Sequence, residues 1–207
     1  MLRILFRNEK TGAARPAIFI DRDGVINRRR AGDYVLSWDQ FEFMRGIRQS
    51  LRGLAELSLP MIVISNQAAV GKGLLDAASL TEITERMQRA LLEDGTAIAG
   101  AYYCTHRPDE KCICRKPQPG LLYRAAVDYN IDLRLSIFIG DSQTDVQAAR
   151  AAGCRPVLLG SGVSNGSITE DWLKEIPVAL TPIQLFEVAT KCLTDPGCPS
   201  PRIVATS

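Results

Sequence analysis

Residues 17–24 of the chain have the sequence Ala-Ile-Phe-Ile-Asp-Arg-Asp-Gly, an apolar run followed at once by two aspartates. Four apolar residues in a row, without alternation, are typical of a short strand that is buried on both faces. Asp21 and Asp23 flank one residue, so in an extended segment their side chains lie on the same side. This stretch therefore predicts a buried strand with an acidic pair at its carboxyl end.

Apolar runs of the same kind recur along the chain and alternate with amphipathic patterns. The predicted strands cover residues 17–20, 61–64, 99–103, 136–139 and 156–159, and the predicted helices cover about 43–58, 80–91, 119–129, 143–152 and 182–193. Buried strands that alternate with helices favour a parallel sheet covered on both faces. We expect a Rossmann-like three-layer α/β fold without a large cap domain, and the strand order stays open.

Length and composition are those of one globular domain. The chain has 207 residues, of which 46% are hydrophobic and 23% charged, and its net charge is +2. We expect an N-terminal extension (1–16), a single domain (17–193) and a disordered tail (194–207). Near-neutral charge and only 6% aromatic residues argue against nucleic-acid binding. Without a long apolar run or a leader-like N-terminus, we expect a cytoplasmic protein that does not bind membranes. Because no exposed repeat or heptad is evident, we expect a monomer.

Polar side chains gather after three of the predicted strands. Asp21 and Asp23 follow the first, Ser65 and Asn66 the second, and Asp141 the strand at 136–139. Ligands of open α/β sheets bind at the carboxyl ends of the strands. Three carboxylates cannot stay ionised together without a cation, and oxygen ligands favour Mg²⁺. The pattern predicts a Mg²⁺ site that binds a phosphoryl group.

Further residues complete this candidate site, although each has a simpler explanation. Lys116 and the Ser65 hydroxyl could hold a phosphoryl group while one carboxylate attacks phosphorus and another moves the proton. An aspartate after a strand is more often a turn or helix-capping residue. Asp145, one turn into a predicted helix, could orient Lys116 or simply favour the positive end of that helix. All of these segments occur in order, each at a predicted strand end or in the loop before a helix. This combination favours a functional site over separate turn or capping residues.

These motifs resemble the haloacid dehalogenase superfamily of phosphatases. The resemblance covers about residues 17–160 and depends on Asp21-x-Asp23-Gly24, Ser65-Asn66-Gln67, Arg115-Lys116-Pro117 and Gly140-Asp141-x-x-x-Asp145. Within the superfamily, the chain is most similar to the heptose bisphosphate phosphatases of bacterial envelope-sugar synthesis. The histidinol phosphate phosphatases are the near relatives.

The resemblance implies a role for each matching position. It makes Asp21 the nucleophile that forms an aspartyl phosphate and Asp23 the general acid and base. Mg²⁺ would be bound by Asp21, the backbone carbonyl of Asp23, and Asp141. The residues that would contact the substrate are Ser65 and Lys116 at the transferring phosphoryl group, and Asn66 and Arg115 at phosphate or sugar.

A second cluster combines three of the six cysteines with the only histidine. Cys104-x-His106 and Cys112-x-Cys114 supply four ligands with no open position, which is typical of structural rather than catalytic Zn²⁺. A disulfide or unrelated thiols are the alternatives. Because Arg115 and Lys116 follow directly, a metal in this loop would fix both cations beside the phosphate. Cys154, Cys192 and Cys198 receive no role.

The surroundings of the site also allow expectations. Loops 28–38 and 68–74 should border it, because no lid domain fits between the motifs. The run Arg28–Arg30 is more typical of a solvated surface, but together with Lys72 it could attract a second phosphate.

The sequence thus favours a Mg²⁺-dependent phosphoric monoester hydrolase that acts on a small sugar phosphate, with a heptose bisphosphate ahead of histidinol phosphate. A catalytically silent binding or scaffold domain and a zinc-organised nucleic-acid module are the alternatives of other classes.

Overall fold

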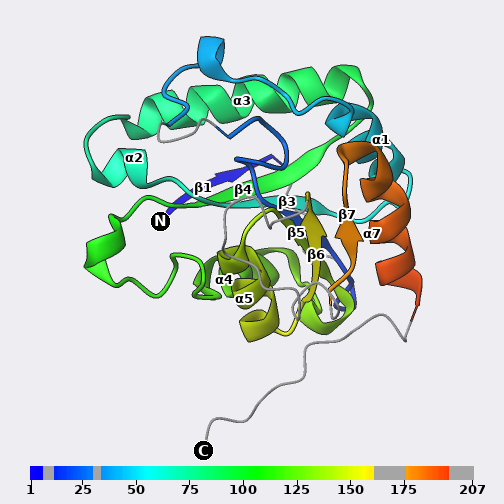
Figure 1. The fold of residues 1–207 in the computed structure, drawn as a ribbon. Coiled ribbons are helices and arrows are strands. Elements are labelled where there is room, and N and C mark those ends of the chain that lie inside the picture. Colours follow the sequence, from blue (N-terminus) through cyan, green and yellow to red (C-terminus); the bar gives the residue numbers. More distant parts are fainter. Residues whose placement is uncertain (7–11, 30–33, 161–175, 196–207) are drawn as a thin grey trace, which may run out of the picture.

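The computed structural model describes residues 1–6, 12–29, 34–160 and 176–195. A seven-stranded sheet runs through these residues in the order β1-β4-β3-β2-β5-β6-β7 (Figure 1). Its strands are β1 Leu2–Leu5, β2 Ile18–Ile20, β3 Met61–Asn66, β4 Ile98–Cys104, β5 Ile137–Gly140, β6 Arg155–Leu159 and β7 Val178–Ala179. Strands β2 to β7 pair in parallel, and only the edge strand β1 is antiparallel to its neighbour, β4.

Helices cover both faces of this sheet, as the uninterrupted apolar strands predict (Figure 1). On one face lie α1 Ile47–Ala55, α3 Ala77–Glu93 and α7 Leu185–Thr194, and on the other lie α4 Gly120–Tyr129 and α5 Gln143–Ala152. Strand β2 shows the principle, because Ile18 and Ile20 pack into the first layer and Phe19 into the second. The predicted three-layer α/β fold is confirmed.

Short elements complete the chain between these layers. Helix α2, Ala68–Gly71, follows β3, and the 3-10 turns are η1 Trp38–Gln40, η2 Pro108–Glu110, η3 Leu133–Leu135 and η5 Pro182–Gln184. The described residues between β2 and β3 hold only η1, α1 and loops, so no cap domain is inserted there. The expected open site without a large lid agrees with this arrangement.

The helix boundaries follow the local signals in the sequence. Helix α3 begins after Asp76, whose side chain accepts a hydrogen bond from the backbone N–H of Ser79 at 2.6 Å. Helix α5 spans residues 143–152 as predicted and ends at Gly153, which has a left-handed φ of 82°. Helix α1 is shorter than the predicted 43–58, because Gly46, also left-handed, precedes its first turn.

Two strands were not predicted from the sequence. Residues 2–5, within the expected N-terminal extension, form the edge strand β1, in which Leu2 pairs with Tyr103. The residues of β1 alternate between half-buried and exposed, none is fully buried, and four residues are too few for a clear period. Strand β7 has two residues. Of the predicted tail, Thr194 ends α7, whereas residues 196–207, including Cys198, lie outside the described residues. The same holds for residues 161–166, whose Gly/Ser-rich sequence predicts a loop.

Candidate active site

The strand order brings the predicted motifs to one edge of the sheet. Strand β2 lies between β3 and β5, with Ile20 beside Val63 on one side and Ile139 on the other. The backbone N–H of Asp21 donates to the carbonyl of Ile139 at 2.9 Å, so Asp21 still follows the line of the sheet. The carboxyl ends of three neighbouring parallel strands therefore meet at Asp21, Ser65 and Asp141.

Three acidic side chains converge at this edge. Carboxylate oxygens of Asp21, Asp141 and Asp145 all lie within 4.8 Å of one another. Burial raises the pKa of Asp21 to about 6 and that of Asp141 to about 7, and the neighbouring carboxylates add to both shifts. The cluster therefore favours protons or a cation at neutral pH.

Lys116 supplies one positive charge inside this acidic cluster. Its side chain is only 3% exposed, and its Nζ lies 2.9 Å from Asp21 Oδ1 and 2.6 Å from Asp145 Oδ1. Burial alone would lower the pKa of Lys116, but the charges of Asp145 and Asp21 outweigh it and raise the pKa. The lysine therefore remains an ammonium ion beside the expected nucleophile.

Asn66 holds the backbone on which this lysine stands. Its Oδ1 accepts from the N–H of Lys116 at 3.1 Å, and its Nδ2 donates to the carbonyl of Lys116 at 3.2 Å. Both amide atoms of Asn66 are thus used to connect the end of β3 with the loop that carries Lys116. The expected contact of Asn66 with phosphate or sugar stays a prediction.

Asp145 performs both of the tasks that the sequence left open. Its Oδ1 pairs with Lys116, and its Oδ2 accepts hydrogen bonds from the backbone N–H groups of Asp141 and Ser142 at 3.2 and 3.1 Å. Ser142 and Asp145 form the capping box that begins α5. Asp145 therefore positions Lys116 and the Asp141 turn together.

The carboxylate of Asp23 is held by three side chains to which the sequence gave no role. Arg22, Asn27 and Gln67 all donate hydrogen bonds to it. Burial would raise the pKa of Asp23, but the charge of Arg22 and these hydrogen bonds outweigh burial and lower the pKa. Arg22 and Gln67 stand inside the quoted motifs, and an arginine placed between two aspartates at the end of a predicted buried strand is the signal that could have found Arg22.

The oxygen atoms around Asp141 fit a divalent cation. Gly24 has a φ of 95°, and a Cβ atom there would lie 1.8 Å from Asp141 Oδ2, so the backbone after Asp23 runs directly against this carboxylate. Arg29 Nη2 lies 2.7 Å from Asp141 Oδ1 and 3.4 Å from the carbonyl oxygen of Asp23. A cationic group thus already sits between the two oxygens that the resemblance assigns to Mg²⁺, and an all-oxygen donor set suits that ion.

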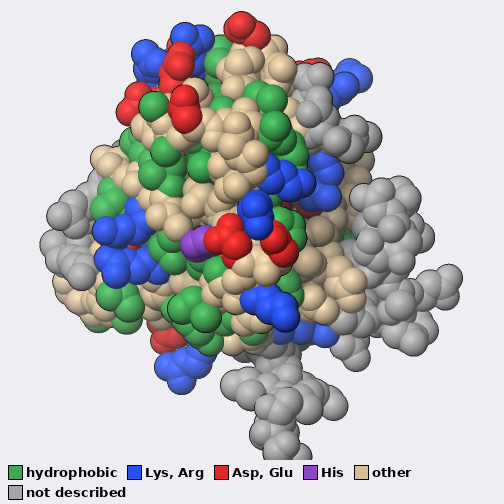
Figure 2. Space-filling view, turned by 90° about the vertical axis from the view of Figure 1, so that its left-hand side faces the viewer, with side chains coloured by type: hydrophobic (Ala, Val, Ile, Leu, Met, Phe, Trp, Pro, Cys, Tyr) green, Lys and Arg blue, Asp and Glu red, His purple; other side chains and the backbone are tan. Residues whose placement is uncertain are grey.

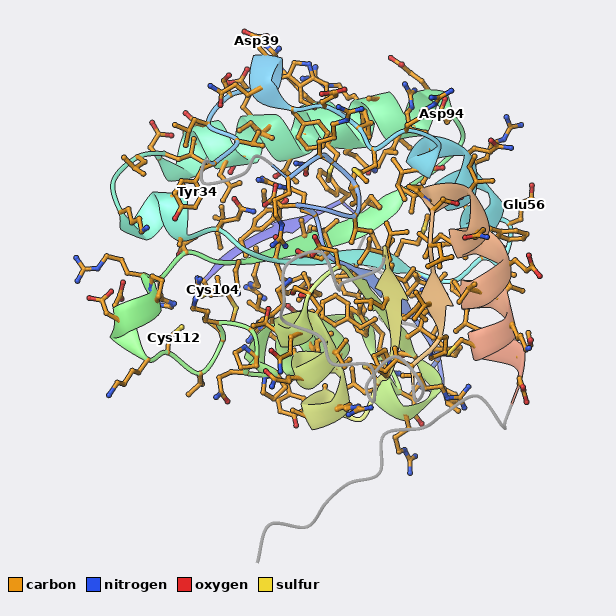
Figure 3. All side chains as sticks on the ribbon, in the orientation of Figure 1. Tyr34, Asp39, Glu56, Asp94, Cys104 and Cys112 are labelled. Atoms are coloured by element: carbon orange, nitrogen blue, oxygen red, sulfur yellow. The ribbon has the colours of Figure 1, made fainter. Side chains whose placement is uncertain are left out.

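A second candidate metal centre lies after β4. The Sγ atoms of Cys104, Cys112 and Cys114 are free thiols, and Cys112 Sγ lies 3.5 Å from Cys104 Sγ and 3.6 Å from Cys114 Sγ. His106 Nδ1 lies 3.6 Å from Cys104 Sγ and 3.3 Å from Cys114 Sγ. In a tetrahedral site with metal–sulfur bonds of about 2.3 Å, ligand atoms lie roughly 3.5–3.8 Å apart. The four residues therefore form a nearly preformed site that could hold a metal ion. Figure 3 labels two of them, Cys104 and Cys112.

The position of this cluster links it to Lys116. The loop after β4 lies on the same side of the molecule as α2 (Figure 1). Figure 2 views this side and shows the single histidine at its surface. Burial raises the pKa of Cys114 to about 12, so its thiol stays neutral until a cation enters. Arg115 and Lys116 follow Cys114 directly, as expected from the sequence.

The loops expected to border the site approach each other. Lys72 Nζ lies 5.3 Å from the centre of the Tyr34 ring, which connects the two segments. Arg28 pairs with Glu42 at 3.2 Å, and both side chains are more than half exposed, which agrees with a solvated surface. Arg30 lies outside the described residues. Arg115 Nη1 is buried and has no hydrogen-bond partner among the described residues.

Fold and site together define the class of this protein as a phosphatase of the haloacid dehalogenase superfamily. A family model described as HAD-hydrolase-like matches residues 113–182. A D-glycero-alpha-D-manno-heptose-1,7-bisphosphate 7-phosphatase of Mycobacterium tuberculosis is 38% identical over 79% of this chain and 90% of its own length. The beta-heptose counterpart of Yersinia pestis is 35% identical over 80% of this chain and 95% of its own length.

Solved structures agree with these relatives. A D,D-heptose 1,7-bisphosphate phosphatase of B. bronchiseptica, crystallised with magnesium and phosphate, superposes with a TM-score of 0.74 at 33% identity. The match covers 83% of this chain and 96% of that protein. The chain belongs to the heptose bisphosphate phosphatase family of the haloacid dehalogenase superfamily.

None of the described helices combines the length with the apolar character that crossing a membrane requires.

We predict that Mg²⁺ stabilises the protein more at about pH 8 than at about pH 5.5. Asp21 and Asp141 have folded pKa values of about 6 and 7, above the usual 3.8, so the metal-free fold loses stability as the pH rises through this window. A cation that binds the ionised carboxylates removes this cost. The shift of Tm on adding Mg²⁺ at each pH measures the effect.

The Asp141→Asn variant is the control for this prediction, because it removes one of the two titrating carboxylates. Its Tm should respond less to Mg²⁺ and depend less on pH. Equal Mg²⁺ shifts in the native protein at both pH values would contradict the prediction.

Proposed function

We propose that this protein removes the 7-phosphate of a D-glycero-D-manno-heptose 1,7-bisphosphate, with Asp21 as the nucleophile. The observation that carries the proposal is the meeting of Asp21, Asp141 and Asp145 around the buried Lys116. The named relatives support the substrate, since those described above are heptose-1,7-bisphosphate 7-phosphatases. They include both anomeric types, so both anomers belong in the test.

The chemistry follows from the positions of these groups. A carboxylate oxygen of Asp21 attacks phosphorus while the bond from phosphorus to the sugar oxygen breaks. Asp23, which Arg22 and its hydrogen bonds keep ionised in the free protein, first takes up a proton from the entering phosphate monoanion and then donates it to that oxygen. Water then attacks the aspartyl phosphate, Asp23 takes up the proton, and inorganic phosphate leaves with Asp21 restored. Lys116 neutralises the phosphoryl oxygens, and the Ser65 hydroxyl hydrogen-bonds one of them. Mg²⁺, when bound by Asp21, Asp141 and the carbonyl of Asp23, supplies further neutralisation.

The second phosphate of the substrate requires its own cation. Arg115 is suited to it, because its buried Nη1 has no hydrogen-bond partner among the described residues. Lys72, at the carboxyl end of α2, offers a further positive charge. These groups favour a bisphosphate over histidinol phosphate, which carries a single phosphate group.

We also propose that the ion held by Cys104, His106, Cys112 and Cys114 is Zn²⁺ in a structural role. Three thiolates and an imidazole fill a tetrahedral shell, and soft sulfur ligands select zinc over magnesium. The ion would fix the loop that carries Arg115 and Lys116. Residues 17–193 then form one catalytic domain, to which β1 adds an edge strand, and a cytoplasmic monomer stays a prediction.

We predict that Asp21→Asn lowers phosphate release by about 10³-fold or more, because an amide cannot attack phosphorus. The assay uses 4-nitrophenyl phosphate and both heptose bisphosphate anomers with Mg²⁺, and unchanged Tm and circular dichroism show that the variant is folded. Substantial turnover by Asp21→Asn would contradict the role of nucleophile. A higher kcat/KM for histidinol phosphate than for either heptose bisphosphate would overturn the proposed substrate.

We predict that Cys112→Ser reduces bound zinc, measured by elemental analysis, and lowers kcat/KM together with Tm. The loss follows because Lys116 stands two residues after Cys114, so a loop without the ion can move the Lys116 backbone away from Asn66. Cys154→Ser is the matched control, since Cys154 is also buried but lies outside the cluster. It should keep full zinc content, and full activity in zinc-free Cys112→Ser protein would refute the structural role.

A further inference from the structure

A buried arginine lies directly beneath the acid/base carboxylate. The side chain of Arg22 is 1% exposed, and its Nε and Nη2 donate to Asp23 Oδ1 at 3.2 and 3.0 Å. Nη2 also lies 3.1 Å from Asp23 Oδ2 and donates to Gln67 Oε1 at 3.0 Å. A buried guanidinium with this fork geometry fixes the plane of the carboxylate that it binds.

Gln67 connects Asp23 with the residue expected to hold the phosphoryl group. Its Nε2 donates to Asp23 Oδ2 at 2.6 Å and to Ser65 Oγ at 3.2 Å, and the residue is 2% exposed. One amide group thus contacts both partners, while Arg22 holds the other end of that amide. The distance between the Ser65 hydroxyl and the Asp23 carboxyl is therefore set by Gln67.

The Asp23 side chain nevertheless remains accessible to a substrate. Asn27 Nδ2 completes its support by donating to Oδ1 at 2.9 Å, and 26% of the side chain is still exposed. The described contacts come from the protein beneath and beside the carboxylate, so it is held in place without being enclosed. Small displacements of this carboxyl group would slow proton transfer, because the transfer requires hydrogen-bond distance to the reacting oxygen.

We propose that Gln67, supported by Arg22, is a positioning residue that places the Asp23 carboxyl against the oxygen of the leaving alcohol. This inference rests on the proposed role of Asp23 as acid and base. In the first step Asp23, protonated by the entering phosphate monoanion, gives this proton to the sugar oxygen. At the same time the bond from that oxygen to phosphorus breaks and Asp21 forms a bond to phosphorus. Without Gln67 the carboxyl can turn away from this oxygen while Asp21 and Lys116 remain in place.

The proposal predicts a loss that depends on the leaving group. A sugar alkoxide leaves poorly unless it receives a proton, whereas 4-nitrophenolate is stable without one. A misplaced Asp23 should therefore slow the heptose bisphosphate most and 4-nitrophenyl phosphate least, with phenyl phosphate between them. General loss of folding or of metal would slow all three substrates by the same factor.

The test is kcat/KM of Gln67→Met with these three substrates and saturating Mg²⁺, because kcat/KM reports the step in which the alcohol leaves. We expect the loss with heptose bisphosphate to exceed that with 4-nitrophenyl phosphate by about tenfold, a fraction of the full effect of a general acid. Arg22→Lys, which keeps the charge but loses the fork, should shift the ratio in the same direction. It also keeps the proposal testable should Gln67→Met not fold.

Gln88→Met is the matched control. Gln88 is a buried glutamine on α3 whose Oε1 accepts from the N–H of Ile98, at the start of β4 and away from the site. It should lower Tm and leave the ratio between substrates as in the native protein.

The Asp23→Asn variant distinguishes the acid/base role of Asp23 from the positioning role of Gln67. If Asp23→Asn does not change the ratio between substrates, the acid/base role within the proposed function is wrong. If Asp23→Asn changes the ratio but Gln67→Met and Arg22→Lys lower all three substrates equally, the positioning role is overturned and the proposed function stands.

Discussion

The contact of Lys116 with Asp21 and Asp145 is the interaction on which the site depends. An ammonium group and two carboxylates are buried together, and each would be strongly unfavourable alone. The arrangement requires three separate segments to meet: the end of β2, the loop after the cysteine cluster and the first turn of α5. Removing one of the three charged groups leaves an uncompensated buried charge. The same ion pairs therefore stabilise the fold and arrange the site.

Two supports hold this lysine from the side of the loop. Asn66 hydrogen-bonds the backbone of Lys116 to the end of β3. The cluster of three cysteines and one histidine brings together the end of β4 and the residues that directly precede Arg115 and Lys116. A loop with few apolar contacts has little hydrophobic burial to keep its shape, as Ile113 illustrates by being 83% exposed between two of the cysteines. Ligands around an ion can order such a segment without a packed core.

Most of this architecture could be predicted from local sequence signals. Runs such as residues 17–20 and 136–139 are buried on both faces and therefore show their strands without ambiguity, and the aspartates after them indicate the edge that carries the site. Strand β1 could not be predicted, because its half-buried residues are held by pairing with β4, which is distant in sequence. The roles of Arg22 and Gln67 likewise could not be predicted, because their hydrogen bond forms only when the ends of β2 and β3 lie side by side in the fold.

The guanidinium of Arg29 between Asp141 and the carbonyl of Asp23 has a consequence for loading the enzyme. A divalent ion that takes these two oxygens has to displace an arginine that is already there. In the proposed Mg²⁺ site, metal uptake would therefore be an exchange of counter-ions, and the arginine that is released would be free to pair with another anion.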